Sequence, residues 1–201
     1  SVKQGEDTNG YARASYGEYN TVELEGAFGF RVNDQLALRL SGLFQQRDDF
    51  VDNAFTGEDE AFEGFEESAA RVQALWSPLP TTDVLINVHG SQNASDARLI
   101  SANIIYQCSL GLSSSFDFDT DIIDDQNEKA QEAFGVTLRV DHEFNDAVDF
   151  TYVYGYETAE VFSRGDIDGG FGAAFLGAGN FGPGFIPFPS ESAGGVDDLR
   201  Q

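Results

Sequence analysis

The residues from Leu36 to Phe44 alternate between two kinds of side chain, and this pattern constrains the fold more than any other feature of the chain. Every second position is leucine, glycine or phenylalanine, whereas the positions between them include Arg39 and Ser41. A period of two predicts a β-strand with unlike faces. Charged residues crowd the segment 47–53 that follows. The strand therefore passes from an apolar environment, either a protein core or a lipid bilayer, into water.

The same alternation recurs along the chain and predicts an antiparallel meander of about seven strands. Residues 11–19 carry a weak version of the pattern, and the clear versions lie at residues 21–30, 70–76, 84–89, 134–144 and 148–156. Most of the breaks between them are rich in Gly, Asn, Asp or Pro, which are the usual turn residues.

The connections between these stretches alternate in length. Short turns are predicted near residues 31–35, 77–83 and 145–147, and long loops near 48–68, 91–132 and from 157 onward; only the connection at 17–20 is short where a long one is expected. In a meander this order places the long loops at one end, as in outer-membrane β-barrels. Aromatic residues flank the predicted strands as interfacial belts require: Phe30, Phe44, Trp76, Phe144, Phe150 and Tyr156.

Composition excludes several classes of protein. The chain has 201 residues and a net charge of −24, which makes nucleic acid an unfavourable partner. Its 18 Phe and 7 Tyr argue against disorder. No apolar run approaches the roughly 18 residues of a transmembrane helix, although a membrane strand needs only about 10. The chain starts at Ser1 without a signal segment, so we expect a mature product or a piece of a longer protein. The single Cys108 is expected to be free or bonded outside the chain.

Several segments together resemble the start of the barrel of TonB-dependent outer-membrane receptors. They are Tyr16–Thr21, Glu25–Ala27, Leu36–Gly42 and Arg47–Asn53, and Leu75–Pro78 is similar to the end of the fourth strand in that family. The likeness covers about residues 10–90 and is only architectural beyond them. One departure is Asp49, where the family usually has Gly.

The resemblance implies an all-β, antiparallel up-and-down transmembrane β-barrel of about 22 strands around an N-terminal plug. This chain would supply seven to eight of those strands with long extracellular loops: residues 1–201 are expected to be a fragment of the barrel domain that lacks the plug and the TonB-binding segment. We expect strands and loops over residues 10–162, then a Gly/Phe-rich loop and a ragged end over 163–201. The implied location is the bacterial outer membrane.

The implied function is active uptake of a scarce nutrient such as a siderophore, cobalamin or a glycan, and we expect the fragment to be inactive alone. The implied partners are outer-membrane lipid, the plug domain and the TonB complex. Two other classes stay open: a passive porin or structural outer-membrane barrel, and a soluble secreted β-sandwich that binds carbohydrate or calcium. No nucleophile–base–acid set, P-loop or CxxC motif occurs, so we expect neither an enzyme nor a bound cofactor.

Charged residues and one histidine on the predicted polar face are the candidate site: Glu23, Glu25, Arg39, Arg71, His89, Arg139 and Asp141. They could form a lumen wall that contacts the plug or a passing substrate. Alternatively, they pair only with one another, which is the default for charges removed from water. His89 is expected to be a hydrogen-bonded wall residue, and His142 falls on the opposite, apolar face.

Two further candidates lie in the long loops. Asp117, Asp119, Asp121 and Glu128 match positions 1, 3, 5 and 12 of a calcium loop, but Ile122 occupies the place of its essential glycine, so a solvated acidic loop is preferred. Loop 91–132 and the segment 166–188 are expected to contribute to substrate choice. The second of these contains aromatic residues that could contact a ring-bearing ligand: Phe171, Phe175, Phe181, Phe185 and Phe188.

Overall fold

The computed structural model of the chain describes residues 8–96, 117–121, 123, 127–166 and 191–200. The described part is all-β, as predicted, and contains no helix. In particular, it has no helix long and apolar enough to cross a membrane. Cys108 and the phenylalanines between 171 and 188 lie outside the described residues.

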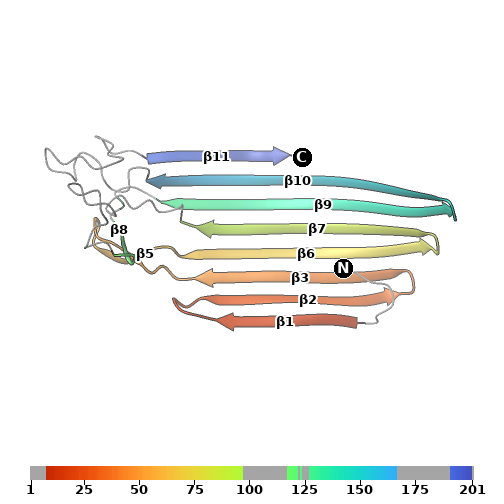
Figure 1. Cartoon of the computed structure of the whole chain (residues 1–201), viewed down its shortest axis with the longest axis horizontal. Helices are drawn as coiled ribbons and strands as arrows, with labels where there is room; N and C mark the ends of the chain where they lie inside the picture. The colour runs from red at the N-terminus through yellow and green to blue at the C-terminus, as the bar shows by residue number, and fades with distance from the viewer. Residues whose placement is uncertain (1–7, 97–116, 122, 124–126, 167–190, 201) are drawn as a thin grey trace.

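Eight strands form one large sheet in the order β1-β2-β3-β6-β7-β9-β10-β11, with every neighbouring pair antiparallel (Figure 1). Their bounds are β1 Thr8–Tyr16, β2 Val22–Asn33, β3 Leu36–Arg47, β6 Phe65–Leu79, β7 Thr82–Ser95, β9 Glu128–Asn145, β10 Val148–Asp166 and β11 Glu191–Arg200. The predicted meander is confirmed, and all seven predicted strands are present. The sheet is open: within the described residues, β1 and β11 each pair on one side only.

The strands extend well beyond the alternating pattern. The 18 residues of β9 and the 19 residues of β10 are paired almost throughout. The prediction of a loop and ragged end from residue 163 is wrong in two places, because β10 continues to Asp166 and β11 pairs with it. Backbone hydrogen bonds hold a ladder together whether or not its side chains alternate, so a strand with both faces in water leaves no signal of period two.

The predicted sorting of the connections is confirmed. The hairpins β2–β3, β6–β7 and β9–β10 turn within two residues at one end of the sheet, which we call the turn end (right in Figure 1). The longer connections join the described ends of β3 and β6, of β7 and β9, and of β10 and β11, and these ends all lie at the opposite, long-loop end. At the turn end the side chains of Asn33 and Asn145 each accept a backbone N–H two residues onward, at 2.9 and 3.0 Å. These Asx-turns are local and explain why the short turns were predictable.

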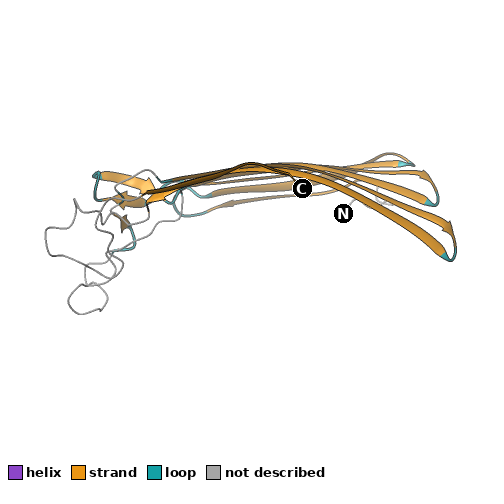
Figure 2. Cartoon of the chain, turned by 90° about the horizontal axis from the view of Figure 1, so that it is seen from above, coloured by secondary structure: helices purple, strands orange, loops and turns teal. Residues whose placement is uncertain are grey.

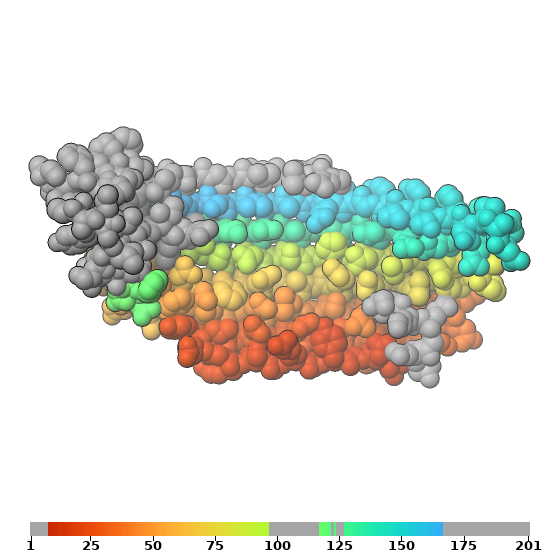
Figure 3. Space-filling view, in the orientation of Figure 1, coloured from red at the N-terminus to blue at the C-terminus, as the bar shows by residue number. Residues whose placement is uncertain are grey.

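The main sheet is a single curved layer (Figure 2). On the face that Figure 3 shows, the strands β1, β2, β3, β6, β7, β9 and β10 lie side by side with no second layer of described residues over them. In these strands the only apolar side chains that are buried are Ala27 and Ala37. This part of the sheet therefore has no hydrophobic core of its own.

The register places nearly all the predicted apolar positions on one face. Leu40, for example, lies between Phe28 of β2 and Val72 of β6. The large side chains of this apolar face are about half exposed, among them Leu24, Phe28, Leu40, Val72, Trp76, Ile86, Phe134, Phe150, Tyr152 and Tyr154. An exposed apolar surface of this extent marks an interaction with a partner or a membrane.

A small second sheet gathers two of the long connections. Strands β5 (Glu58–Phe62), β4 (Val51–Asn53) and β8 (Thr120–Asp121) pair in that order, with β4 and β8 parallel; we call them the loop sheet. Val51, Phe62 and Ile123 form its buried apolar cluster. The buried Asn53 side chain donates to the Ile123 carbonyl at 3.0 Å and accepts the N–H of Phe55 at 3.0 Å. The sequence did not predict this sheet, because its strands are two to five residues long and because β4 pairs with β8 across about 68 residues, from Asp52 to Thr120.

Candidate functional site

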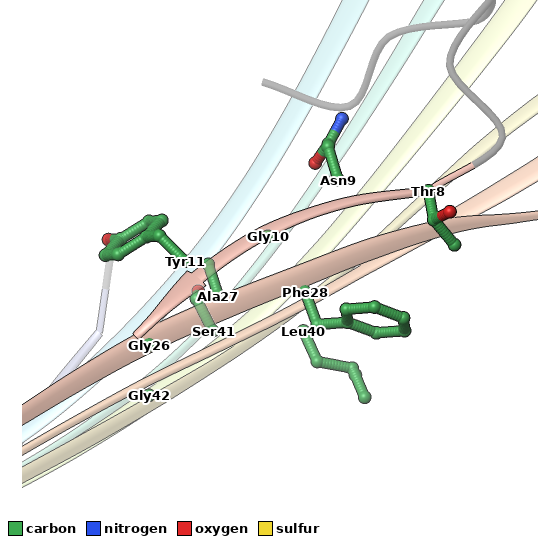
Figure 4. Close-up of a pocket in the computed structure, with 10 residues that line it drawn as sticks. All are labelled: Thr8, Asn9, Gly10, Tyr11, Gly26, Ala27, Phe28, Leu40, Ser41 and Gly42. Carbon is green, nitrogen blue, oxygen red and sulfur yellow. The ribbon is translucent and has the colours of Figure 1, made fainter. Parts of the chain in front are cut away.

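The seven predicted site residues lie on one face of the main sheet, opposite the apolar face. The strand register shows this: Arg39 lies opposite Gly29 and Gln73 on the neighbouring strands, and Arg71 lies opposite Ser41 and His89. Figure 4 shows the separation of the two faces around β1 to β3, where Phe28 and Leu40 point to one side and Asn9 points to the other. We call the side that carries Asn9 the polar face.

Neutral partners satisfy the charges near β1. The Tyr11 hydroxyl donates to the Glu25 carboxylate, and the Ser15 hydroxyl donates to Glu23 at 2.7 Å. The Arg39 guanidinium donates to the Asn9 side-chain oxygen at 3.0 Å. The acids and bases in this region therefore do not form the mutual ion pairs that the simple pairing hypothesis requires. The sequence offered no signal for these partners, because β1 had the weakest alternation.

Arg139 and Asp141 form the one predicted charge pair that is seen among the described residues. Arg139 Nε lies 2.7 Å from an Asp141 oxygen, and the Thr151 hydroxyl donates to the same carboxylate at 2.8 Å. The side chains are 53% and 38% exposed. A pair this exposed contributes little to the stability of the fold.

His89 is positioned by a glycine on the next strand. Its imidazole lies over Gly135, and a Cβ added there would lie 2.5 Å from His89 Cε1. Asn87 Nδ2 approaches His89 Nδ1 at 3.3 Å. The Asn87 side-chain oxygen is itself buried without a hydrogen-bond partner. His89 is thus held by packing over Gly135 and by its contact with Asn87, and His142 lies on the apolar face beside Phe150.

A shallow hollow of about 640 Å³ lies beside these residues. Its polar-face lining includes Glu25 from β2, Arg71 from β6 and His89 from β7, together with the phenol of Tyr11. Arg71 makes no hydrogen bond or ion pair with another described side chain, so its guanidinium is available to an anionic group. The mixed charge suits a polar ligand or a polar protein surface.

The four residues with the spacing of a calcium loop do not form a metal site in the part of the chain that the structure describes. Asp117 accepts the backbone N–H of Asp119 at 3.2 Å, Asp121 is buried in β8, and Glu128 begins β9. Across the part of the chain that the structure describes, no group of three or more His, Cys, Asp or Glu residues is placed to hold a metal ion.

A stacked cluster at the long-loop end went unpredicted. The Arg47 guanidinium lies over the rings of Phe50 and Phe65, at 5.0 and 5.1 Å from their centroids. Tyr19 stacks on Phe50 with 4.2 Å between centroids. Arg47 also donates to the carbonyl oxygen of Glu63. The cluster fixes the start of the connection 48–64 against the ends of β3 and β6.

No protein-family model and no solved structure matches this chain.

Gly135 gives a test of this packing. Gly135→Ala should destabilise the fold by about 1–3 kcal/mol, because the new methyl group displaces the His89 ring. Gly155→Ala is the matched control, because Gly155 lies on the same face and an added Cβ there meets nothing within 4 Å. The free energy of unfolding in urea measures both effects. Adding His89→Ala to the Gly135→Ala variant should restore most of the lost stability. Equal stability of Gly135→Ala and Gly155→Ala would contradict the packing of His89 against Gly135.

Proposed function

We propose that this chain forms part of the wall of an outer-membrane β-barrel, with the apolar face against lipid and the polar face toward the lumen. The supporting observation is the extent of the uncovered apolar face, which runs from β2 to β10. A lipid bilayer covers such a face without a second protein layer. The polar face would then line the interior, as in barrels whose strands alternate in this way.

The height of the apolar band agrees with a bilayer. On β9 the band runs from Phe134 to Phe144, ten residue steps or about 34 Å of strand at ~3.4 Å per residue. A strand tilt of about 40° reduces this to a height of roughly 26 Å, close to the ~25 Å apolar band of outer-membrane barrels. Aromatic side chains lie near both limits, with Trp76 and Phe150 toward the turn end and Phe44 and Phe134 toward the long loops.

The strands continue beyond the band only toward the long-loop end. Gln92, Glu132 and Glu160 occupy the next row on the apolar side, where lipid contact would be unfavourable for carboxylates. This row supports an assignment of the long loops to the outside of the cell and of the turns to the periplasm. A soluble β-sandwich is less favoured, because the described residues provide no second sheet for the apolar face.

Within this class, the resemblance of residues 10–90 favours a TonB-dependent receptor over a passive porin. The proposed activity is uptake of a siderophore, cobalamin or a glycan through the barrel of the complete receptor. Arg71, His89 and Glu25 would face the lumen and contact either the plug or the passing substrate. The loop sheet would lie over the outer mouth of this part of the wall.

Leu40→Arg tests which face meets lipid. Leu40 is near the middle of the band, so the substitution should destabilise the inserted protein by about 2–4 kcal/mol. Leu43→Arg makes the same change on the polar face, opposite Glu25, and should change stability by less than about 1 kcal/mol. Unfolding in lipid vesicles gives both values. Equal losses would remove the assignment of the faces.

Labelling of cysteines tests the orientation. In a Cys108→Ser background, Asp59→Cys in the loop sheet should react with a membrane-impermeant maleimide on intact cells. Asp34→Cys, in an exposed turn, should react only after the outer membrane is permeabilised. Reaction of both positions on intact cells would contradict a transmembrane arrangement.

Dependence on TonB separates the receptor from a pore. Cells that express the complete protein should accumulate a candidate siderophore, cobalamin or glycan only when TonB is present, because active uptake requires its energy. Accumulation that is equal in cells with and without TonB would indicate a passive porin.

A further inference from the structure

Two carboxyl groups far apart in sequence meet at the long-loop end. Asp49 follows β3 and Asp96 follows β7. Asp96 Oδ2 accepts the N–H of Glu63 at 2.6 Å, and Asp49 Oδ1 accepts the N–H of Gly64 at 2.6 Å. The two carboxyl groups thus accept from N–H groups of adjacent residues, and both border the same cavity. Three segments therefore converge on one point: the ends of β3 and β7 and the return from the loop sheet to β6.

The backbone at this point is held in an unfavourable conformation. Glu63 has a φ of 74°, in the left-handed region that residues other than glycine seldom adopt. Arg47 supports it by donating to the Glu63 carbonyl, and lies 3.6 Å from the Glu63 carboxylate. Gly64 is required as glycine, because an added Cβ would lie 2.5 Å from Asp49 Oδ1. The contacts to the two carboxyl groups thus hold a conformation that the chain does not adopt freely.

Negative charge surrounds the pair. The carboxyl groups border a cavity of about 490 Å³. The titratable and charged side chains that face it come from every described element packed there: Arg47 of β3, Asp48 and Asp49 after it, Glu60 of β5, Glu63, Glu66 of β6 and Asp96. Arg47 is the only cation in this set, and it already contacts the carboxylate and the carbonyl oxygen of Glu63. Two ionised carboxylates in contact repel each other, whereas one shared proton turns the same contact into a hydrogen bond.

We propose that Asp49 and Asp96 form a proton-dependent latch that holds the loop sheet against the ends of β3, β6 and β7. With one proton on the pair, the latch is closed. When that proton is lost, the two carboxylates separate, the N–H groups of Glu63 and Gly64 lose their acceptors, and the segment 48–64 loosens. The latch does not depend on the proposed receptor function, because all of its parts lie beyond the apolar band.

The direction in which the pKa of Asp96 is shifted agrees with this proposal. The pKa of Asp96 is raised to about 6: removal from water has the largest effect, the Glu63 N–H opposes it, and the neighbouring Asp49 and Glu63 add to the rise. A raised carboxyl pKa means that the closed form binds the proton more tightly than the open form. Its contribution to closure is therefore complete below pH 3.8 and is lost as the pH rises through about 6.

Hydrogen exchange on the full-length protein tests the latch. Protection factors, which remove the intrinsic pH dependence of exchange, should fall about tenfold at Glu63 and Gly64 between pH 5 and pH 7.5. Residues 36–44 of β3 should keep their protection, which excludes global unfolding. Asp96→Asn should abolish the change, because its amide can donate to Asp49 without a proton and its oxygen can still accept from Glu63.

Asp59→Asn is the matched control: it removes an exposed carboxylate from β5 and should leave the pH dependence of the native protein unchanged. Asp49→Asn should act like Asp96→Asn, which provides a second variant if the first does not fold. Equal protection of Glu63 and Gly64 at pH 5 and pH 7.5 in the native protein would overturn the latch. Persistence of the pH dependence in both asparagine variants would overturn it as well.

Discussion

The structure depends on the hydrogen-bond ladder between neighbouring strands. In a sheet that is one layer thick and has only Ala27 and Ala37 as buried apolar residues, packing within the described chain contributes little. The ladders of β3, β6, β7, β9 and β10 are instead long and largely regular, so nearly every backbone group in them is paired. Such a sheet is stable only where other apolar groups cover its apolar face, and in the proposed arrangement membrane lipid does so.

The two faces meet different physical demands. The apolar face presents rows of Leu, Val, Phe and Tyr that match one another across strands. The polar face satisfies its charges locally, as Glu25 does with Tyr11, Arg39 with Asn9 and Asp141 with Arg139. Arg13 and Arg71 are exceptions, since neither makes a hydrogen bond or ion pair with another described side chain. These two guanidinium groups are left for water or for a partner.

At the long-loop end, the loop sheet has what the main sheet lacks, a buried apolar cluster of Val51, Phe62 and Ile123. This cluster joins two connections that the sequence presents as separate loops. Asn53 joins the two connections to each other, and the stack around Arg47 and the Asp49–Asp96 pair tie the unit to the main sheet. The connection 48–64 is therefore packed against the described residues 119–121 and 123 of the next long connection.

The sequence alone determined the all-β class, seven strands, the unlike faces and the end at which the long loops gather. These features depend on residue alternation and on local turns such as that of Asn33, and both are visible in the sequence itself. Only the tertiary structure decided how far the strands extend, that β11 pairs with β10, that Asn9 meets Arg39 and that Asp49 meets Asp96. Among the described residues, the carboxylates of Asp117, Asp119 and Asp121 do not form a metal site, although their spacing resembles a calcium loop. The reason is that backbone pairing in water and contacts across 30 to 47 residues leave no periodic trace in the chain.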